Sequence, residues 1–252
     1  MIDPLAVLIA SCLLTAGATI KGLLGIGLPM VAIPGLTLVF GLPTALAMVS
    51  IPVAAANLWQ VWLYRRTEGI WPVLLPFVCA GALGTALGTI ILVSVAEVVL
   101  ELALAAMLVA YIVFRVAQPG WALSGRRARA GALPVGLAAG MLHGATGISG
   151  PIGITFFHAQ GLQRPQFILA SGVMFLCFTL VQIPMLGATG VLGGSEALVG
   201  IVGLPAVALG LYLGDRLARR VDPVLFDRLV LLVLGWTAGA LLWRAVGALV
   251  AG

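Results

Sequence analysis

The sequence predicts an all-α polytopic membrane protein, on the evidence of its composition, its recurring apolar runs and an internal repeat. Of its 252 residues, 62% are hydrophobic and only 8% are charged, whereas a soluble domain carries roughly a quarter charged residues. Apolar runs recur along the whole chain, so we expect many helices in a lipid bilayer and not a soluble domain with one anchor. The net charge of +5 falls in short loops and reports orientation, so no nucleic-acid partner is expected.

The chain contains two copies of one unit. The segment KGLLGIGLP at 21–29 matches HGATGISGP at 143–151, and the same spacing pairs Gln60 with Gln182. Repetition of this kind is the signature of a duplicated fold. We therefore expect a first transmembrane repeat over 1–117, a polar cytoplasmic linker over 118–130, and a second transmembrane repeat over 131–252.

Each repeat is expected to begin with two short apolar segments around a Gly-rich break and to continue with three full-length crossings. The short segments are 5–20, 29–40, 131–146 and 151–160. The expected crossings are 43–64, 70–93, 97–117, 165–187, 196–214 and 224–249. A crossing helix needs about 20 residues, so a short pair in the second repeat forms either one broken crossing or a hairpin that leaves on the side it entered.

The positions of the arginines favour the hairpin. With Arg65 and Arg66 in the cytoplasm, broken crossings would place five other arginines outside: Arg164, Arg216, Arg219, Arg220 and Arg228. Re-entrant hairpins leave only Arg244 outside, as the positive-inside rule prefers. A hairpin plus three crossings is an odd number of passes, so the second repeat is inverted relative to the first. We expect two inverted repeats, each a broken or re-entrant helix pair plus three transmembrane helices, which is a recurrent transporter architecture.

The two breaks predict a site for an anion. Irregular backbone is tolerated inside a membrane only where protein or a watery cavity satisfies it. Pro29 and Pro151 follow the breaks, where proline suits the first turn of the next half-helix. The free amides at such a helix start, aided by the helix dipole, attract negative charge. The candidate backbone positions are Gly22, Gly25, Gly27, Gly144, Gly147 and Gly150.

Two basic side chains stand at matching positions of the breaks, namely Lys21, the single lysine of the chain, and His143. A cation in an apolar interior is a functional candidate. Two plainer interpretations stay open: Lys21 could snorkel to an interface, and His143 could be a neutral residue that hydrogen-bonds between helices. Thr146 and Ser149 could donate further hydrogen bonds to an oxyanion.

Three amide side chains, Asn57, Gln60 and Gln182, fall within predicted crossings, where they either line a cavity or bond between helices. The acidic residues all lie at or near segment ends, so the mid-membrane carboxylate typical of cation pumps is missing. The three cysteines lie far apart in apolar runs and are expected to be free thiols. The expected ligand is therefore a small anion, and no metal site or cofactor is expected.

The Gly-rich break followed by proline, the second proline at the start of the next helix, and the duplicated half resemble the sulfite exporter TauE/SafE family, also called the 4-toluene sulfonate uptake permease family. The resemblance covers nearly the whole chain and is strongest in KGLLGIGLPMVAIPGLTLVFGLPTALA at 21–47. It implies a secondary transporter, in a bacterial inner membrane, for a small sulfur-containing anion such as sulfite or an organosulfonate. Leu28 interrupts the denser glycine run of the family.

The mechanism we expect is export by alternating access around a midplane anion site, because the membrane potential favours an outward-moving anion by about 2.3 kcal/mol per charge per 100 mV. An anion channel is the first alternative. An intramembrane hydrolase is the second, because residues 147–150 spell GxSG and Ser149 could act as a nucleophile if a base lies within hydrogen-bond reach. His143 precedes it on the same segment, but the matching break at 25–28 has no serine.

Overall fold

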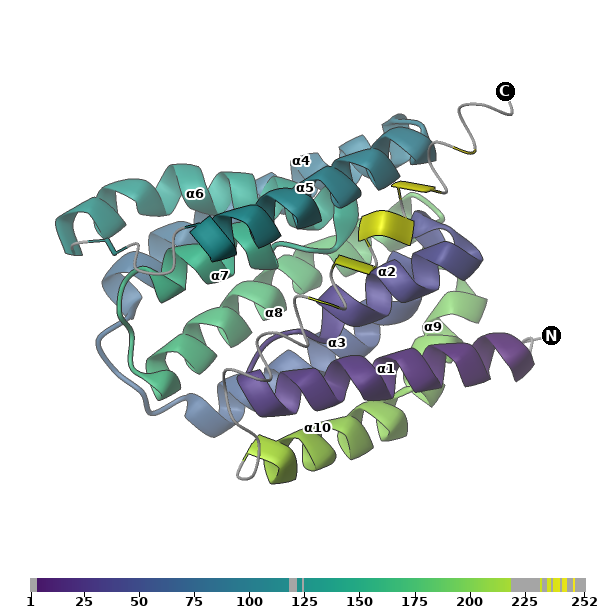
Figure 1. The fold of residues 1–252 in the computed structure, drawn as a ribbon, viewed down its shortest axis with the longest axis horizontal. Coiled ribbons are helices and arrows are strands. Elements are labelled where there is room, and N and C mark those ends of the chain that lie inside the picture. Colours follow the sequence, from purple (N-terminus) through teal and green to yellow (C-terminus); the bar gives the residue numbers. More distant parts are fainter. Residues whose placement is uncertain are drawn as a thin grey trace.

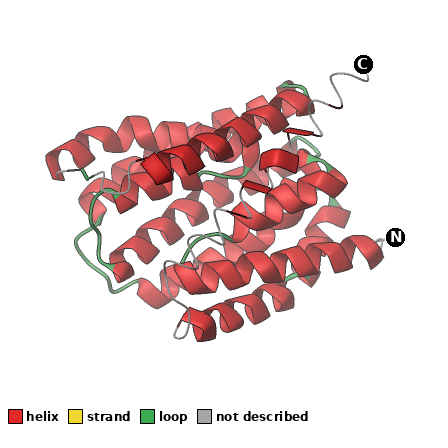
Figure 2. Ribbon diagram, viewed as in Figure 1, coloured by secondary structure: helices red, strands yellow, loops and turns green. Residues whose placement is uncertain are grey.

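A computed structural model describes residues 4–117, 122–123 and 125–218, together with residues 232, 235, 236, 238–240, 242, 243 and 247 (Figure 1). The described elements are all helices, joined by short loops (Figure 2). The expected crossing at 224–249 lies mostly outside the described residues, and Arg219, Arg220, Arg228 and Arg244 lie outside them. The described residues confirm the predicted all-α class.

The helices of the first half are α1 (Pro4–Leu24), α2 (Leu28–Phe40), α3 (Leu42–Tyr64), α4 (Trp71–Ser94) and α5 (Glu97–Ala117). Those of the second half are α6 (Gly125–Thr146), α7 (Gly150–His158), α8 (Arg164–Ala188), α9 (Gly194–Val202) and α10 (Leu204–Ala218). The breaks between α1 and α2 and between α6 and α7 span residues 25–27 and 147–149. Both therefore occupy the same place in their repeats.

Three boundaries differ from the expected ones. α1 continues to Leu24, and α6 begins at Gly125 inside the expected linker, because the arginines and alanines of GRRARA favour a helix. The expected crossing at 196–214 is divided at Gly203 into α9 and α10. Pro205 explains this division, because proline lacks an amide hydrogen and restricts the residue before it.

Among the described residues, five stretches are long and apolar enough to cross a membrane: Pro4–Leu24, Leu42–Tyr64, Trp71–Ser94, Arg164–Ala188 and Gly194–Ala218. By contrast, α2 has 13 residues and α7 has 9, which is too few for a crossing. The described residues thus form a polytopic helical membrane protein with short half-helices after each break. The inversion of one repeat relative to the other stays a prediction.

The contacts between the halves come in matching pairs. α1 packs along α10, and α6, the counterpart of α1, packs along α4 (Figure 1). α3 packs against its own counterpart, α8. Glycines allow the close approach, since a Cβ atom at Gly214 would lie 2.2 Å from the carbonyl oxygen of Thr19. Each repeat therefore pairs its first helix with a late helix of the other.

The side chain of Glu97 caps the N-terminus of α3. Its Oε1 atom accepts a hydrogen bond of 2.6 Å from the amide of Leu42, which follows Gly41 at φ 81°. The first amides of a helix have no intrahelical partner, and a carboxylate there also interacts favourably with the helix dipole.

Glu97→Ala is expected to destabilise the protein by about 1 kcal/mol, the typical cost of a lost helix cap. Glu97→Gln keeps an oxygen acceptor and is expected to lose less. Thermal unfolding of the detergent-purified variants measures both, with Glu68→Ala at an exposed loop position as the control. An unchanged melting temperature for Glu97→Ala would contradict the capping role.

Candidate anion-binding site

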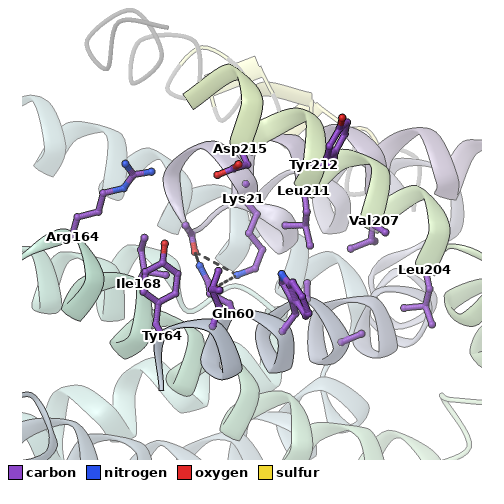
Figure 3. A pocket seen from close by; sticks show the side chains of 17 residues that line it. Lys21, Gln60, Tyr64, Arg164, Ile168, Leu204, Val207, Leu211, Tyr212 and Asp215 are labelled. Atoms are coloured by element: carbon purple, nitrogen blue, oxygen red, sulfur yellow. Dashed lines mark hydrogen bonds between the residues drawn. The ribbon is translucent and has the colours of Figure 1, made fainter. Parts of the chain in front are cut away.

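A cavity of about 740 Å³ lies between α1, α3, α8 and α10 (Figure 3). Its buried end contains Lys21, Gly25 and Gln60, and its lining also includes the exposed residues Arg164 and Asp215. The walls between them are mainly apolar and aromatic, formed by Ala55, Ala56, Trp59, Leu63, Tyr64, Ile168, Leu204, Val207, Ala208, Leu211 and Tyr212. Such a cavity offers a charged group at one end and apolar surface along its length.

Lys21 is bound at the closed end by oxygens of α3 and of the break. Its Nζ atom donates to Gln60 Oε1 at 2.6 Å and more weakly to the carbonyl of Gly25 at 3.4 Å (Figure 3). It also donates to Asn57 Oδ1 at 2.7 Å. The amide nitrogens of Asn57 and Gln60 donate to the carbonyls of Val53 and Gly25, so both amide oxygens must face the lysine. Three acceptors require three N–H donors, which an ammonium group provides.

The hydrogen-bond partners of Lys21 Nζ are all neutral oxygens. The side chain is 2% exposed, so it does not snorkel to an interface. A buried charge with neutral partners lacks the compensation that a counter-charge gives. An anion that enters the cavity would supply that compensation and could form a charge-assisted hydrogen bond.

The two glutamines bind the backbone of the breaks. Gln60 Nε2 donates to the carbonyl of Gly25 at 2.8 Å, and Gln182 Nε2 donates to the carbonyls of His143 at 3.2 Å and Gly144 at 3.1 Å. Among the described residues, the carbonyls of Gly25 and Gly144 have no helical partner at the break, whereas the carbonyl of His143 also accepts from the amide of Gly147. The glutamines thus satisfy backbone groups at the interruption, which is what allows a break inside an apolar bundle. Of the pair, Gln60 also lines the large cavity.

Five of the six predicted glycines divide into two groups. Gly25, Gly27 and Gly147 have φ angles of 84°, 124° and 72°, which a side chain would strain. Gly22 and Gly144 lie within helices instead, where an added Cβ would come within 2.5 Å of the carbonyl oxygen of a neighbouring helix.

The two breaks lie close together. A Cβ at Gly150, the first residue of α7, would stand 3.0 Å from Met30 Sδ near the start of α2. Neither half-helix has a side-chain hydrogen bond at its N-cap. The starts of the two half-helices therefore lie next to each other.

His143 and Lys21, however, line different cavities. His143 faces a second cavity of about 10 Å³ near Gly147, Thr179 and Gln182. Its Nδ1 atom lies 3.4 Å from Ser149 Oγ. The hydroxyl of Thr146 donates to the carbonyl of Leu142 and accepts from the amide of Ile148, so it supports the break itself.

The structure places a possible base, His143, near Ser149 as the hydrolase interpretation requires, but it contains no path by which a substrate could reach the serine. Ser149 is fully buried, and the cavity beside His143 is no larger than a water molecule. The lining of that cavity contains no carboxylate to orient the imidazole. In this conformation no substrate could reach the serine.

Sequence reasoning did not find the walls of the large cavity. A tryptophan near the end of an apolar run, such as Trp59, predicts an interface anchor, Arg164 predicts orientation, and no pattern in the sequence gives Tyr212 or Asp215 a role in a site. All four residues line the cavity, and Tyr212 and Asp215 lie there because α10 is beside α1 (Figure 1). The glycines of α10 that allow a close approach to α1, such as Gly214, were the sequence feature that could have indicated this pairing.

A protein-family model described as "Sulfite exporter TauE/SafE" matches residues 9–241 of the chain. No match was found among the curated proteins or among the solved structures. The family match covers both breaks, the large cavity and the small one.

Proposed function

This chain belongs to the sulfite exporter TauE/SafE family, and on that premise we propose that it is a secondary transporter for an organic sulfonate whose charged group binds at Lys21. Membership of a membrane transporter family agrees with the helices long enough to cross a bilayer. The observation that carries the proposal is the buried Lys21 ammonium, bound only by neutral oxygens at the closed end of a cavity of about 740 Å³.

The cavity favours an organic sulfonate over sulfite. Pockets of roughly 300–1,000 Å³ bind ligands with substantial organic bodies, and a sulfite ion would leave most of this cavity unfilled. The apolar and aromatic walls, which include Trp59, Val207 and Leu211, would bury the organic part of a sulfonate and gain from its removal from water. Arg164, exposed on the cavity lining, would attract the anion.

We further propose that transport proceeds by alternating access between two inverted repeats. The matched pairing of α1 with α10 and of α6 with α4 supports two similar units that can rock against each other. An exporter of anions would be driven outward by the membrane potential.

Thermal stabilisation by a panel of anions tests the binding site. A ligand that binds only the folded state stabilises it by RT ln(1 + [L]/Kd), about 2.7 kcal/mol at 100 times Kd. We expect 4-toluenesulfonate to stabilise the detergent-purified protein more than sulfite, and sulfate and chloride to have little effect. The matched carboxylate, 4-methylbenzoate, separates recognition of the sulfonate from recognition of the ring. No stabilisation by any anion would contradict the proposal.

Flux in proteoliposomes distinguishes a carrier from a channel. A carrier that alternates between two states is expected to exchange labelled 4-toluenesulfonate faster when unlabelled substrate is present on the opposite side. Flux that is insensitive to substrate on the opposite side would favour the channel alternative.

Ala208→Leu tests the organic part of the ligand. Ala208 lines the cavity on α10, so a larger side chain there would occupy space that the toluene ring needs. We expect weaker binding of 4-toluenesulfonate and unchanged binding of sulfite, both measured by thermal shift. Ala106→Leu on the exposed face of α5 is the control, and equal losses for both ligands would contradict the assignment of this wall to the organic body.

A further inference from the structure

The correspondence between the two repeats, which relates Lys21 to His143 and Gln60 to Gln182, also relates Asn57 to another polar residue, Thr179. Three residues of the first half each have a counterpart 122 residues later in the chain: Lys21, Asn57 and Gln60 correspond to His143, Thr179 and Gln182. In the first half the three side chains form a closed set of hydrogen bonds around Lys21 Nζ. The second half carries the same arrangement with a titratable imidazole in place of the lysine.

In the second half, the three corresponding side chains are not joined by hydrogen bonds. Gln182 binds the backbone next to its break as Gln60 does, but neither His143 Nε2 nor Thr179 Oγ1 has a hydrogen-bond partner among the described residues. Both residues are buried, with exposures of 2% and 1%. The imidazole is shorter than a lysine side chain and threonine is shorter than asparagine, so the two groups do not meet. Polar groups buried this deeply are normally hydrogen-bonded.

A cavity of about 10 Å³ is lined by both His143 and Thr179. It has room for about one water molecule and is far too small for a sulfonate. Its lining also includes Pro29 at the start of α2 and Ser50 on α3. The ligand of this second set must therefore be much smaller than the proposed ligand of the large cavity.

We propose that the cavity is a proton-binding site, in which a water molecule bridges His143 Nε2 and Thr179 Oγ1 and His143 accepts a proton that accompanies the anion. The proposal rests on the transport function above. In the tautomer that carries hydrogen on Nδ1, this hydrogen faces Ser149 Oγ. The Nε2 lone pair then faces the cavity and accepts the proton from bulk water by way of the bridging molecule. Histidine is the side chain that ordinarily changes charge near neutral pH.

Among the described residues, those that line the small cavity or contact the imidazole supply no counter-charge to His143. The cavity is lined from α2 by Pro29 and Ile33, and from α3 by Leu46, Val49, Ser50 and Val53. From α8 it meets Thr179 and Gln182, with the rings of Phe175 and Phe178 also beside the imidazole. On α4, the groups around neighbouring Gly144 are Thr85, Gly88 and Thr89. None of these carries a charge or titrates near neutral pH, and the titratable Cys177 of α8 is not part of the lining.

A proton on His143 would therefore be a buried charge without compensation, which is unfavourable. A bound anion would offset the positive charge of Lys21 in the same bundle, and a second positive charge at His143 would then be less unfavourable. Proton binding and anion binding should then strengthen each other by the same factor, because coupling between two sites is reciprocal. The second repeat would in this way supply the coupling ion while the first repeat binds the substrate.

The experiment follows proton movement and 4-toluenesulfonate flux together in proteoliposomes that contain a pH-sensitive dye. In the unaltered protein we expect sulfonate flux to carry protons and to respond to a pH gradient. His143→Gln should still bind sulfonate but lose both the proton movement and the response. His158→Gln, which alters the other histidine of the chain, should keep both. Thr179→Val should need a higher proton concentration for the same stimulation, because the water loses one partner.

Titration calorimetry of the unaltered protein gives a second test that needs no variant to fold. Binding of 4-toluenesulfonate, measured in buffers with different ionisation enthalpies, should take up protons from solution. Sulfonate binding and flux without any proton uptake or movement would overturn the proton site and leave the sulfonate transporter standing. The same conclusion follows if folded His143→Gln moves protons like the unaltered protein. Absence of sulfonate binding altogether would instead overturn the proposed function, and the proton site with it.

Discussion

Lys21→Met is expected to abolish most of the binding of 4-toluenesulfonate. Methionine has nearly the length of lysine without its charge, so the cavity would keep its shape and lose its cation. A hydrogen bond to a charged group contributes about 1.5–3 kcal/mol, which corresponds to roughly a 10- to 100-fold rise in Kd. The dependence of thermal stabilisation on sulfonate concentration measures this change.

Two further variants separate charge from hydrogen bonding and from position. Lys21→Gln keeps N–H donors beside Asn57 and Gln60 but removes the charge, and it should bind nearly as poorly as Lys21→Met. Arg164→Gln removes an exposed cation on the same cavity lining, and it should cause a small loss that disappears at high salt. Sulfonate affinity that is unchanged in folded Lys21→Met would rule out Lys21 as the anion-binding group.

The breaks could be predicted closely because their determinants are local. Glycine and proline act through the conformation of their own residues, so the spacing in 21–29 and 143–151 was enough to place two half-helices. The glycine angles at both breaks agree with that expectation. The polar residues nearest the first break, Lys21 and Gln60, were likewise found on one cavity.

The cavity itself depends on contacts that are remote in sequence. Its wall on α10 lies beside α1 through packing between residues such as Thr15 and Ala206, which are 191 positions apart. A tryptophan at a membrane surface and a tryptophan at a cavity give the same signal in a single sequence, so the sequence alone cannot place Trp59 on the cavity wall. The two repeats also differ in side-chain volume. The large Phe178 occupies the position in the second repeat that corresponds to Ala56 of the cavity wall. The expectation of one site shared by Lys21 and His143 could not anticipate this difference.

Gly140→Ala is expected to cause the largest loss of stability of the substitutions considered. A Cβ atom at Gly140 would lie 1.9 Å from the carbonyl oxygen of Gly81 on α4, and a backbone atom cannot move aside as a flexible side chain can. α4 and α6 would have to separate along the contact that small residues make possible. Overpacking of a filled interior typically costs about 1–3 kcal/mol, and a contact this short should lie at or above the upper end.

Gly187→Ala is the matched control, because nothing lies within 4 Å of a Cβ added at that position of α8. There alanine should stabilise the helix by up to about 1 kcal/mol. The same chemical change is thus expected to lower the melting temperature at one glycine and to leave it unchanged or raise it at the other. Because the α4–α6 contact is not part of the Lys21 cavity, folded Gly140→Ala should still be stabilised by 4-toluenesulfonate with the original affinity. Equal melting temperatures for the two variants would mean that α4 and α6 are not packed through their glycines.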